Sequence, residues 1–289
     1  MKVQIETTDA VIGARVTGVN LEQIPAPELM ETIETALEQH GVLIFPDQSI
    51  TPRQQIDFSR AFADLEMTEL ESARLPGYEE IFVVGNTGQE LVTFAPPEGE
   101  VELEWHTDHI HREVPARASM LYALEVPSSG GDTLFACMYS AYDSLSQQQQ
   151  DEFCTLEIIN SSYGLDQYIA RQQYKDGTKA LTGRHHDKVV RPLVRAHPLT
   201  ERRALYFGNQ VSIGVQGWDE TKSVNFIKQL TEHACQEAFQ YRHKWNQGDV
   251  VLWDNRRVLH AGTPYDTANA RRCLHRTTWR EDKPITKIR

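Results

Sequence analysis

Apolar residues recur at helical spacing in three parts of the chain. Residues 27–39 repeat leucine and isoleucine every four positions, which predicts an amphipathic helix. Residues 52–62 begin with a proline after Thr51, a residue type that caps helices. A longer helix is predicted from about residue 219 to residue 240. We expect these helices to pack on the outside of a sheet.

Short apolar or alternating segments, which are typical of strands, occupy much of the remaining chain. Turn signals rich in glycine, proline and asparagine separate them. The predicted strands are residues 42–45, 81–84, 101–108, 119–126, 132–136, 193–197, 204–208, 250–254 and 272–279. Many short strands with peripheral helices predict an α+β fold with a mainly β core, either a β-sandwich or a jelly roll.

Two segments, residues 64–100 and 160–190, show no clear periodicity. Long irregular segments inside compact domains often serve as lids or substrate-binding loops, and we predict that role for both. No repeat, low-complexity tract or linker divides the sequence. Candidate site residues that are far apart in the chain must also converge in space. We therefore predict a single domain over residues 1–289.

The composition is that of a globular protein that buries an apolar core. The net charge of −12 disfavours nucleic acid as a partner, because binding to nucleic acid usually needs a basic surface. In such an acidic chain, a site for an anionic ligand needs local arginines that overcome the long-range field. Arginines that lie close together in the fold are therefore the residues expected at such a site.

Four scattered cysteines without C-x-x-C spacing indicate free thiols rather than a zinc ribbon or a redox pair. The first residues lack the apolar run of a signal peptide, and no later apolar segment approaches the length of a membrane helix. We therefore predict a cytoplasmic protein without a membrane partner. The sequence leaves homo-oligomerisation open.

The segment VELEWHTD, residues 101–108, contains the strongest candidate metal ligands. Side chains alternate between the two faces of a strand, so His106 and Asp108 are expected to point the same way. A third histidine would complete the facial triad that holds iron(II) with open coordination positions. His260, where an apolar segment meets a polar turn, is the candidate. The pattern H-x-D is common by chance, so alone it is weak evidence.

The other histidines have structural interpretations beside functional ones. His109 and His111 repeat the two-residue spacing and could ligate together, but no carboxylate lies in phase with them. We therefore treat them as candidate substrate contacts rather than metal ligands. His185 and His186 are candidates to line a loop.

Arg272 and Arg276 share one face of the last predicted strand. Burial of two guanidinium groups is costly unless each pairs with an anion. The planar arginine side chain suits a carboxylate or a sulfonate, which it binds through two parallel hydrogen bonds. Salt bridges to acidic residues of the chain are the alternative explanation.

These motifs together resemble the taurine dioxygenase/2,4-dichlorophenoxyacetate dioxygenase family of iron(II)/2-oxoglutarate oxygenases. The resemblance covers nearly the whole chain, and several independent motifs occur in the family's order. The matching segments are HGVLIFPDQ (40–48), TPRQQIDFSRAFADLE (51–66), WHTD (105–108), PSSGGDTLFA (127–136), RHKWNQGDVVLWDNRRVLHAG (242–262) and RRCLHRTTW (271–279).

The resemblance implies a double-stranded β-helix, or jelly-roll, fold and a role for each matching residue. The implied roles are iron(II) binding for His106, Asp108 and His260, binding of the distal carboxylate of 2-oxoglutarate for Thr133 and Arg272, and binding of an anionic substrate group for Arg276. Asp254 and Asn255 either orient the His260 segment or cap a turn.

The implied activity is oxidation, most simply hydroxylation, of a small anionic organic substrate. 2-Oxoglutarate and O₂ would be the cosubstrates, with release of succinate and CO₂. Asp108 argues against a halogenase, because halogenases of this kind replace the carboxylate ligand. The rival hypotheses are a non-catalytic jelly-roll protein that binds a metal or a carboxylate, and a structural-zinc hydrolase, for which no nucleophile is evident.

The residues around the H-x-D motif bear on the substrate. Ionisable side chains are unusually frequent there: Glu102, Glu104, His109, His111 and Arg112. We therefore expect a more polar or zwitterionic substrate than a chlorinated aryloxy acid.

Overall fold

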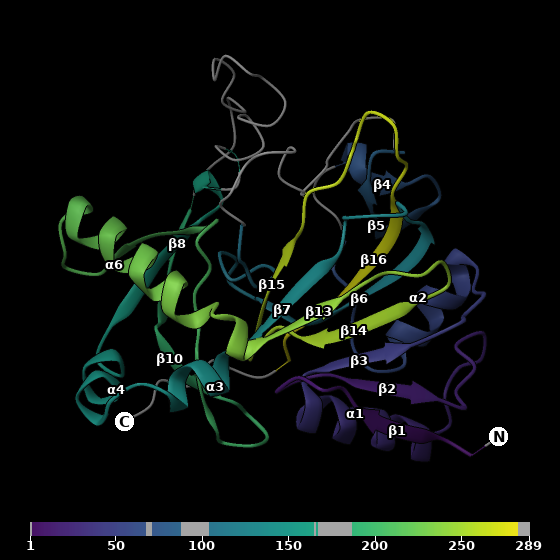
Figure 1. The fold of residues 1–289 in the computed structure, drawn as a ribbon, viewed down its shortest axis with the longest axis horizontal. Helices are drawn as coiled ribbons and strands as arrows, with labels where there is room; N and C mark the ends of the chain where they lie inside the picture. The colour runs from purple at the N-terminus through teal and green to yellow at the C-terminus, as the bar shows by residue number, and fades with distance from the viewer. Residues whose placement is uncertain (1, 68–70, 88–103, 165, 167–186, 283–289) are drawn as a thin grey trace.

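Eight strands pair side by side into one large sheet (Figure 1). The computed structural model describes residues 2–67, 71–87, 104–164, 166 and 187–282, and the strand count holds for these residues. All neighbouring strands are antiparallel except β2 and β3, which are parallel. From one edge to the other the strands are β1 (Gln4–Thr7), β2 (Ala14–Thr17), β3 (Val42–Phe45), β14 (Val250–Asp254), β6 (Ala116–Glu125), β16 (Cys273–Arg280), β5 (Tyr78–Gly85) and β4 (Arg74–Leu75).

The described residues also form three smaller antiparallel sheets. The sheet β13-β7-β15 matters most for the site, because β15 contains His260. The strands of the smaller sheets are β13 (Gln240–His243), β7 (Thr133–Cys137) and β15 (Val258–Gly262), then β12 (Ser212–Val215), β8 (Glu157–Ser161) and β9 (Lys188–Pro192), and finally β10 (Val194–Ala196) with β11 (Arg203–Leu205).

Helices lie at the periphery, as the apolar spacing predicts. Helices α1 (Pro27–His40) and α2 (Pro52–Arg60) pack on the large sheet. Thr51 caps α2 through a reciprocal capping box with Gln54. The remaining helices, α3 (Met138–Asp143), α4 (Gln147–Phe153) and α6 (Glu220–Ala234), lie beside the smaller sheets (Figure 1). None of the helices in the described ranges is both long enough and apolar enough to cross a membrane.

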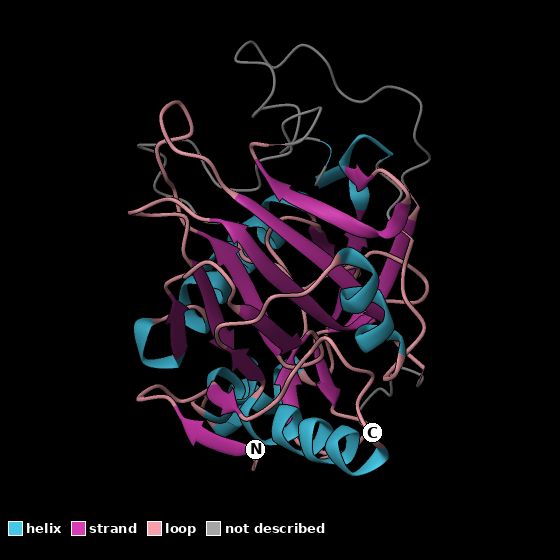
Figure 2. Cartoon of the chain, turned by 90° about the vertical axis from the view of Figure 1, so that its right-hand side faces the viewer, coloured by secondary structure: helices cyan, strands magenta, loops and turns pink. Residues whose placement is uncertain are grey.

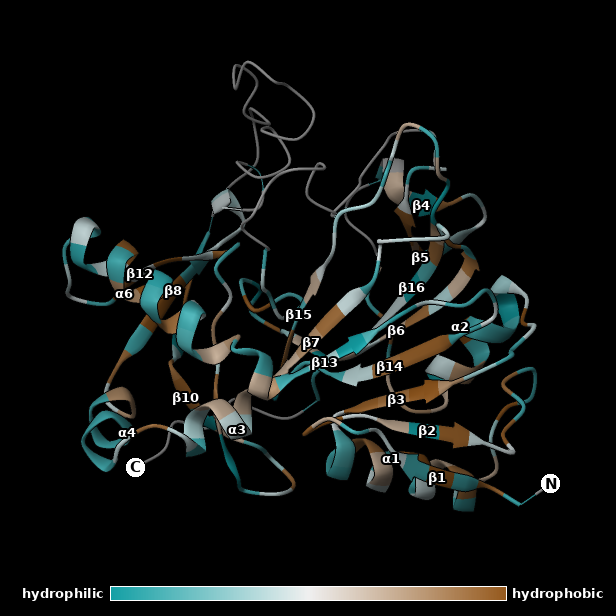
Figure 3. Cartoon of the chain, viewed as in Figure 1, coloured by the Kyte–Doolittle hydropathy of each residue, from teal (hydrophilic) through white to brown (hydrophobic). Residues whose placement is uncertain are grey.

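Both faces of the large sheet are buried at its central strand β14. Along β14, Val250 and Leu252 pack into an apolar cluster with α1, whereas Val251 and Trp253 pack into a second cluster with residues of β7 and β15. A strand covered on both sides is expected to be apolar at successive positions, and β14 and its neighbour β3 are strongly hydrophobic (Figure 3). The second cluster therefore forms the interior between the large sheet and β13-β7-β15.

The strands of the large sheet form one twisted layer, with helices on the outside (Figure 2). This strand-rich arrangement confirms the predicted α+β class with a mainly β core, and strands 42–45 and 250–254 are confirmed at the predicted bounds. The long helix is shorter than predicted, because α6 ends at Ala234. Residues 240–243 instead pair with β7 as strand β13.

The two predicted loop segments are described only in part. Within 64–100, residues 74–85 contain β4 and β5, which pair at the edge of the large sheet. Residues 88–100 and 167–186 lie outside the described residues, and so do His185 and His186.

Candidate functional site

His106 and His260 face each other across a pair of backbone hydrogen bonds. The amide of His106 donates to the carbonyl oxygen of His260 at 3.0 Å, and the amide of His260 donates back at 2.8 Å. His260 lies in the middle of β15, whereas His106 pairs with it through a single isolated bridge. The two imidazole rings consequently lie side by side, with 4.1 Å between their centroids.

The prediction of a strand over residues 101–108 is wrong for residues 104–108, which the structure describes. Residues 104, 105 and 107 have no regular structure, and the chain turns at 108–110. The amide of Asp108 donates to the side-chain oxygen of Asn255 at 3.3 Å, not to a neighbouring strand. His109 has a φ of 57°, which few residues other than glycine adopt. His106 and Asp108 thus converge through a bridge and a turn rather than through strand alternation.

The Asp108 carboxylate lies close to both histidine rings. Its Oδ1 lies 3.9 Å from Nε2 of His106, and its Oδ2 lies 4.0 Å from Nε2 of His260. One ligand atom from each of the three residues lies within 4.8 Å of the others. The three side chains are therefore close enough together to bind one metal ion, as the sequence predicted.

The protonation states of these side chains favour metal binding. Burial lowers the pKa of His106 and of His260, so both imidazoles are neutral near pH 7. Nδ1 of His106 donates to the carbonyl oxygen of Glu104 at 2.9 Å, which leaves a lone pair on Nε2. Burial opposes ionisation of Asp108, but the Arg276 guanidinium holds the pKa of that carboxyl below its usual range.

Both oxygens of the Asp108 carboxylate accept a hydrogen bond from a side chain. The hydroxyl of Ser119, on β6, donates to Oδ2 at 2.6 Å, and Nη1 of Arg276 donates to Oδ1 at 2.8 Å. Ser119 is completely buried, and Asp108 is only 4 % exposed. Two donors therefore fix the rotation of the carboxylate about its last bond.

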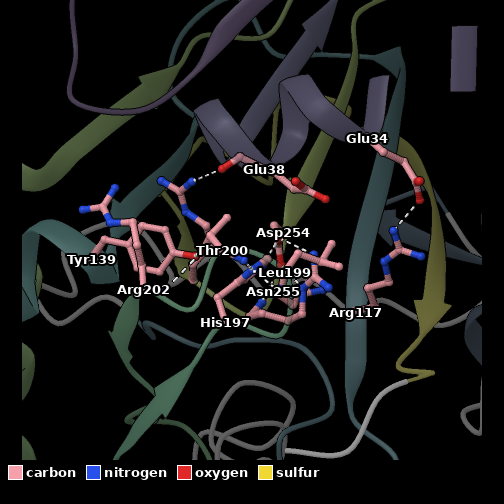
Figure 4. A network of polar contacts seen from close by, with 12 residues as sticks. Glu34, Glu38, Arg117, Tyr139, His197, Leu199, Thr200, Arg202, Asp254 and Asn255 are labelled. Atoms are coloured by element: carbon pink, nitrogen blue, oxygen red, sulfur yellow. Dashed lines mark hydrogen bonds and ion pairs between the residues drawn. The ribbon is translucent and has the colours of Figure 1, made fainter. Parts of the chain in front are cut away.

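A buried ionic network holds the turn between β14 and β15 (Figure 4). Asp254 accepts from Nε and Nη2 of Arg256 at 2.8 and 2.7 Å, and from Nε2 of His197 at 2.9 Å. Nδ1 of His197 accepts from the amide of Thr200, so its hydrogen is on Nε2. Oδ1 of Asp254 also accepts from the amide of Arg256. Asp254 therefore caps the turn and anchors the segment that leads to His260.

Arg272 is a buried cation with no carboxylate within ion-pair distance in the described part of the chain. Its Nε donates to the carbonyl oxygen of Gly131 at 3.1 Å, and burial lowers the pKa of Arg272 to about 10. Gly131 has a φ of 67°, and a Cβ there would lie 3.3 Å from Cδ of Arg272. Glycine thus permits the close approach of the guanidinium to the turn that precedes Thr133.

Thr133, the first residue of β7, is buried and faces a tryptophan. Nε1 of Trp245 donates to the hydroxyl oxygen of Thr133 at 3.0 Å. An indole nitrogen can only donate, so the hydroxyl hydrogen of Thr133 remains for another acceptor. A hydroxyl donor is suited to a carboxylate ligand, and Thr133 stands two residues after Gly131, whose carbonyl oxygen accepts from Arg272.

Arg276 lies beside the metal-ligand group. Its guanidinium lies over the ring of Phe82, 4.8 Å from the centroid, and Nη1 binds Asp108. Its Nε is buried and has no hydrogen-bond partner among the described residues. Arg276 therefore retains donor capacity for an anion next to the two histidines.

His109 and His111 both lie in the turn that begins at Asp108, with their rings edge to face and 6.3 Å apart. Neither belongs to the three-residue metal-ligand group. Burial and the neighbouring Arg112 lower the pKa of His109 well below its usual value. Nδ1 of His109 is buried without a partner in the ranges that the structure describes. A neutral His109 could therefore offer Nδ1 to a polar ligand.

Known proteins are similar to this sequence over nearly its whole length. The model of the taurine catabolism dioxygenase TauD, TfdA family matches residues 4–278. The chain belongs to the TauD/TfdA family. It is 33 % identical over 275 residues to the (S)-phenoxypropionate/alpha-ketoglutarate-dioxygenase of Sphingobium herbicidovorans, with 94 % of this chain and 93 % of that protein covered.

Two further TauD/TfdA-type proteins extend the comparison. The chain is 32 % identical over 293 residues to the alpha-ketoglutarate-dependent 2,4-dichlorophenoxyacetate dioxygenase of Cupriavidus pinatubonensis, with 99 % of this chain and 100 % of that protein covered. Its fold is similar to that of AAD-2 in complex with Mn(II) and N-oxalylglycine, with a TM-score of 0.77, 27 % identity, and 99 % and 100 % of the two chains covered.

As a TauD/TfdA family member, the chain is a dioxygenase that uses iron(II), 2-oxoglutarate (α-ketoglutarate) and O₂. The predicted family, enzyme class and cofactors are confirmed. The comparisons favour this catalytic function over a non-catalytic binding protein and give no support to a zinc hydrolase.

Two side chains that contact the candidate site residues could not be recognised from the sequence patterns. Ser119 stands in a strand of mostly apolar residues, and Trp245 stands alone in a polar segment. Neither has a spacing that relates it to its partner, because Asp108 and Thr133 belong to other segments. Only the three-dimensional arrangement identifies these contacts.

Proposed function

We propose that this TauD/TfdA-family dioxygenase hydroxylates a small anionic organic substrate and converts 2-oxoglutarate to succinate and CO₂. One observation carries the proposal: three side chains suited to iron(II) converge beside Arg276, and both Arg276 and Arg272, four residues earlier, retain capacity for an anion. The metal ligands account for the iron, and the two arginines account for two separate anionic groups.

Iron(II) would be held by His106, Asp108 and His260. Two neutral imidazoles and an ionised carboxylate are the donor set of the facial triad. The hydrogen bond from Nδ1 of His106 to a backbone carbonyl is a contact that metal-binding histidines usually make through their second ring nitrogen. The donor set and its protonation states therefore fit the metal that the family uses.

The distal carboxylate of 2-oxoglutarate would bind Arg272 and Thr133. A buried guanidinium without a carboxylate partner is stabilised by an anion. The hydroxyl hydrogen that Trp245 leaves on Thr133 would supply a second donor. These two donors match the two oxygens of one carboxylate.

An anionic group of the substrate would bind Arg276. The guanidinium would be shared between Asp108 and the substrate, since its Nε is buried without a described partner. That sharing would hold the substrate beside the metal ligands. His109 and His111 would contact polar substituents of the same molecule.

When bound, iron(II) supplies the oxidation, in which 2-oxoglutarate and O₂ react and one oxygen atom is transferred to the substrate. The chain itself supplies binding and orientation. Arg272 and Thr133 would fix the cosubstrate, while Arg276 would fix the substrate. Holding the reactants in a fixed relative position accounts for much of the rate that such residues contribute.

The named relatives act on phenoxypropionate and on 2,4-dichlorophenoxyacetate. We propose a carboxylate substrate for this chain too, with more polar substituents than a chlorinated aryloxy group. Arg112 cannot contribute freely, because Nη1 of Arg112 binds Glu66 at 3.1 Å. The expectation of polar substituents therefore depends mainly on His109 and His111.

We also propose that the large sheet and β13-β7-β15 are the two layers of a double-stranded β-helix within a single domain over residues 1–289. The apolar cluster shared between these sheets supports this architecture. The segments within 64–100 and 160–190 would supply substrate loops. A cytoplasmic location agrees with the free cysteines in the described part of the chain.

A succinate assay tests the proposed function. Protein supplied with iron(II), 2-oxoglutarate and O₂ is screened against amino-acid-like acids, aryloxyacetates and sulfonates, and succinate should rise only with a substrate. Asp108→Ala should lower turnover by more than about 100-fold, because loss of a ligand exceeds loss of an outer contact. Asp57→Ala, which removes a half-buried carboxylate of α2 that pairs with Arg53, is the control. Full activity of Asp108→Ala would refute the metal assignment, and a preference for aryloxyacetates would refute the polar-substrate proposal alone.

A further inference from the structure

A chain of buried hydrogen bonds ends on the Asp108 carboxylate. Nε1 of Trp253 donates to Oδ1 of Asn255 at 2.9 Å, and Nδ2 of Asn255 donates to Oγ of Ser119 at 2.9 Å. The hydroxyl of Ser119 then donates to Oδ2 of Asp108 at 2.6 Å. None of these four residues is more than 4 % exposed. We call Trp253, Asn255 and Ser119 the carboxylate relay.

The direction of every bond in the carboxylate relay follows from its first member. An indole nitrogen only donates, so the Asn255 atom that faces Trp253 must be the amide oxygen. The amide of Asp108 donates to the same oxygen at 3.3 Å, which requires the same orientation. The amide nitrogen of Asn255 must then face Ser119, whose hydroxyl hydrogen is left for Asp108.

The backbone of Asn255 strengthens the connection. The hydroxyl of Thr107 donates to the carbonyl oxygen of Asn255 at 2.6 Å, next to the bond from Asp108 to the Asn255 side chain. Asn255 itself follows Asp254, which His197 and Arg256 anchor. The turn after β14 thus holds both the backbone and the carboxylate of the segment that contains Asp108.

We propose that Ser119 and Asn255 are positioning residues for the metal centre: the carboxylate relay sets the orientation of Asp108 toward the metal. This proposal rests on the role of Asp108 under the proposed function. Outer hydrogen bonds to metal-binding carboxylates orient the ligand, and their loss typically weakens metal binding by about 10–100-fold. The sequence suggested only that Asn255 serves the His260 segment or a turn, whereas its side chain acts on Asp108.

Binding of Co²⁺, measured by competition with a chelating dye, tests the relay without turnover. Ser119→Ala removes the donor to Asp108. Asn255→Asp keeps the shape but replaces the amide donor with an acceptor, so the Ser119 hydroxyl would turn toward residue 255. Each variant should weaken Co²⁺ binding by about 10–100-fold. Trp253→Phe, which releases the amide orientation, should weaken binding by a smaller factor.

The double variant distinguishes positioning from general damage. If Asn255 acts through Ser119, the double variant should lose about as much Co²⁺ affinity as the more strongly affected single variant. If the two residues act independently, the fold-losses of the two single variants should multiply. Ser223→Ala is the matched control, because Ser223 is also a buried serine, and its hydroxyl oxygen accepts a hydrogen bond from the amide of Val215. It should lower the unfolding temperature of the metal-free protein without changing Co²⁺ affinity.

Asp108→Ala in the same titration separates the role of the carboxylate relay from the role of Asp108 itself. Weak binding by Asp108→Ala with parent-like binding by Ser119→Ala and Asn255→Asp would overturn the relay alone. Multiplicative effects in the double variant would also overturn it. Parent-like binding by Asp108→Ala would overturn the metal assignment, and the relay with it.

Discussion

Arg272 directly precedes strand β16 and Arg276 lies within it, four positions later, yet their surroundings are opposite. Arg272 is buried against the carbonyl oxygen of Gly131 and has no carboxylate partner among the described residues. Arg276 binds the Asp108 carboxylate and lies over the ring of Phe82. One cation lacks a counter-ion, and the other already has one.

The difference indicates two kinds of anion site. An anion at Arg272 neutralises a charge that burial already penalises, so the gain on binding is large. An anion at Arg276 must share the guanidinium with Asp108, so the gain is smaller and depends on the metal centre. Tight binding of a common cosubstrate and looser binding of a variable substrate are the expected consequences.

The largest effect is expected at Arg272. Arg272→Gln should raise the KM for 2-oxoglutarate by about 100-fold, since loss of one partner in a buried charge pair typically costs about 2–5 kcal/mol. The KM for the organic substrate should change little. Steady-state kinetics with each compound varied in turn measure both values, and equal changes in the two would contradict the division between the arginines.

A smaller effect is expected at Arg276. Arg276→Lys keeps the charge but removes the planar pair of donors, so the KM for the organic substrate should rise by about 10-fold. The KM for 2-oxoglutarate should remain within about twofold. Arg280→Lys, on the same strand and half exposed, is the matched control. A larger effect on 2-oxoglutarate than on the substrate would reverse the two assignments.

The smallest effect concerns His275, which precedes Arg276 on the opposite face of β16. Burial lowers the pKa of His275 to about 4. The unfolded chain binds a proton at this residue below about pH 6.5, whereas the folded chain does not until about pH 4, so stability falls as the pH drops through that range.

His275→Gln should therefore have an unfolding temperature that depends less on pH between about 6.5 and 4 than that of the parent. Thermal unfolding at several pH values measures this difference. Parallel curves for the two proteins would show that His275 does not contribute.

Local patterns determined how much of this molecule could be predicted from its sequence. The strand at 42–45 and the cap at Thr51 depend on nearby residues, so periodicity and capping chemistry were sufficient. His106 and Asp108 were correctly brought together, but for an incorrect reason, because a single bridge and a turn replace the strand. Motif content predicted which side chains converge better than periodicity predicted the local backbone structure.

Contacts between remote segments could not be predicted. Ser119 is one serine in a buried strand, and its importance depends on which strand lies beside it and which residue faces it. Trp245 likewise gains its role only because β13 pairs with β7 and brings the following segment to Thr133. Sequence spacing does not contain these distances, since they arise from sheet order.

Trp253 has a further consequence. Its ring centroid lies 4.7 Å from that of His260, within the apolar layer between the sheets. An indole so close to a candidate ligand is a built-in fluorophore, and its emission should be quenched when a paramagnetic ion binds. The fluorescence of Trp253 should therefore report whether a metal ion is bound. The same residue is the first member of the carboxylate relay.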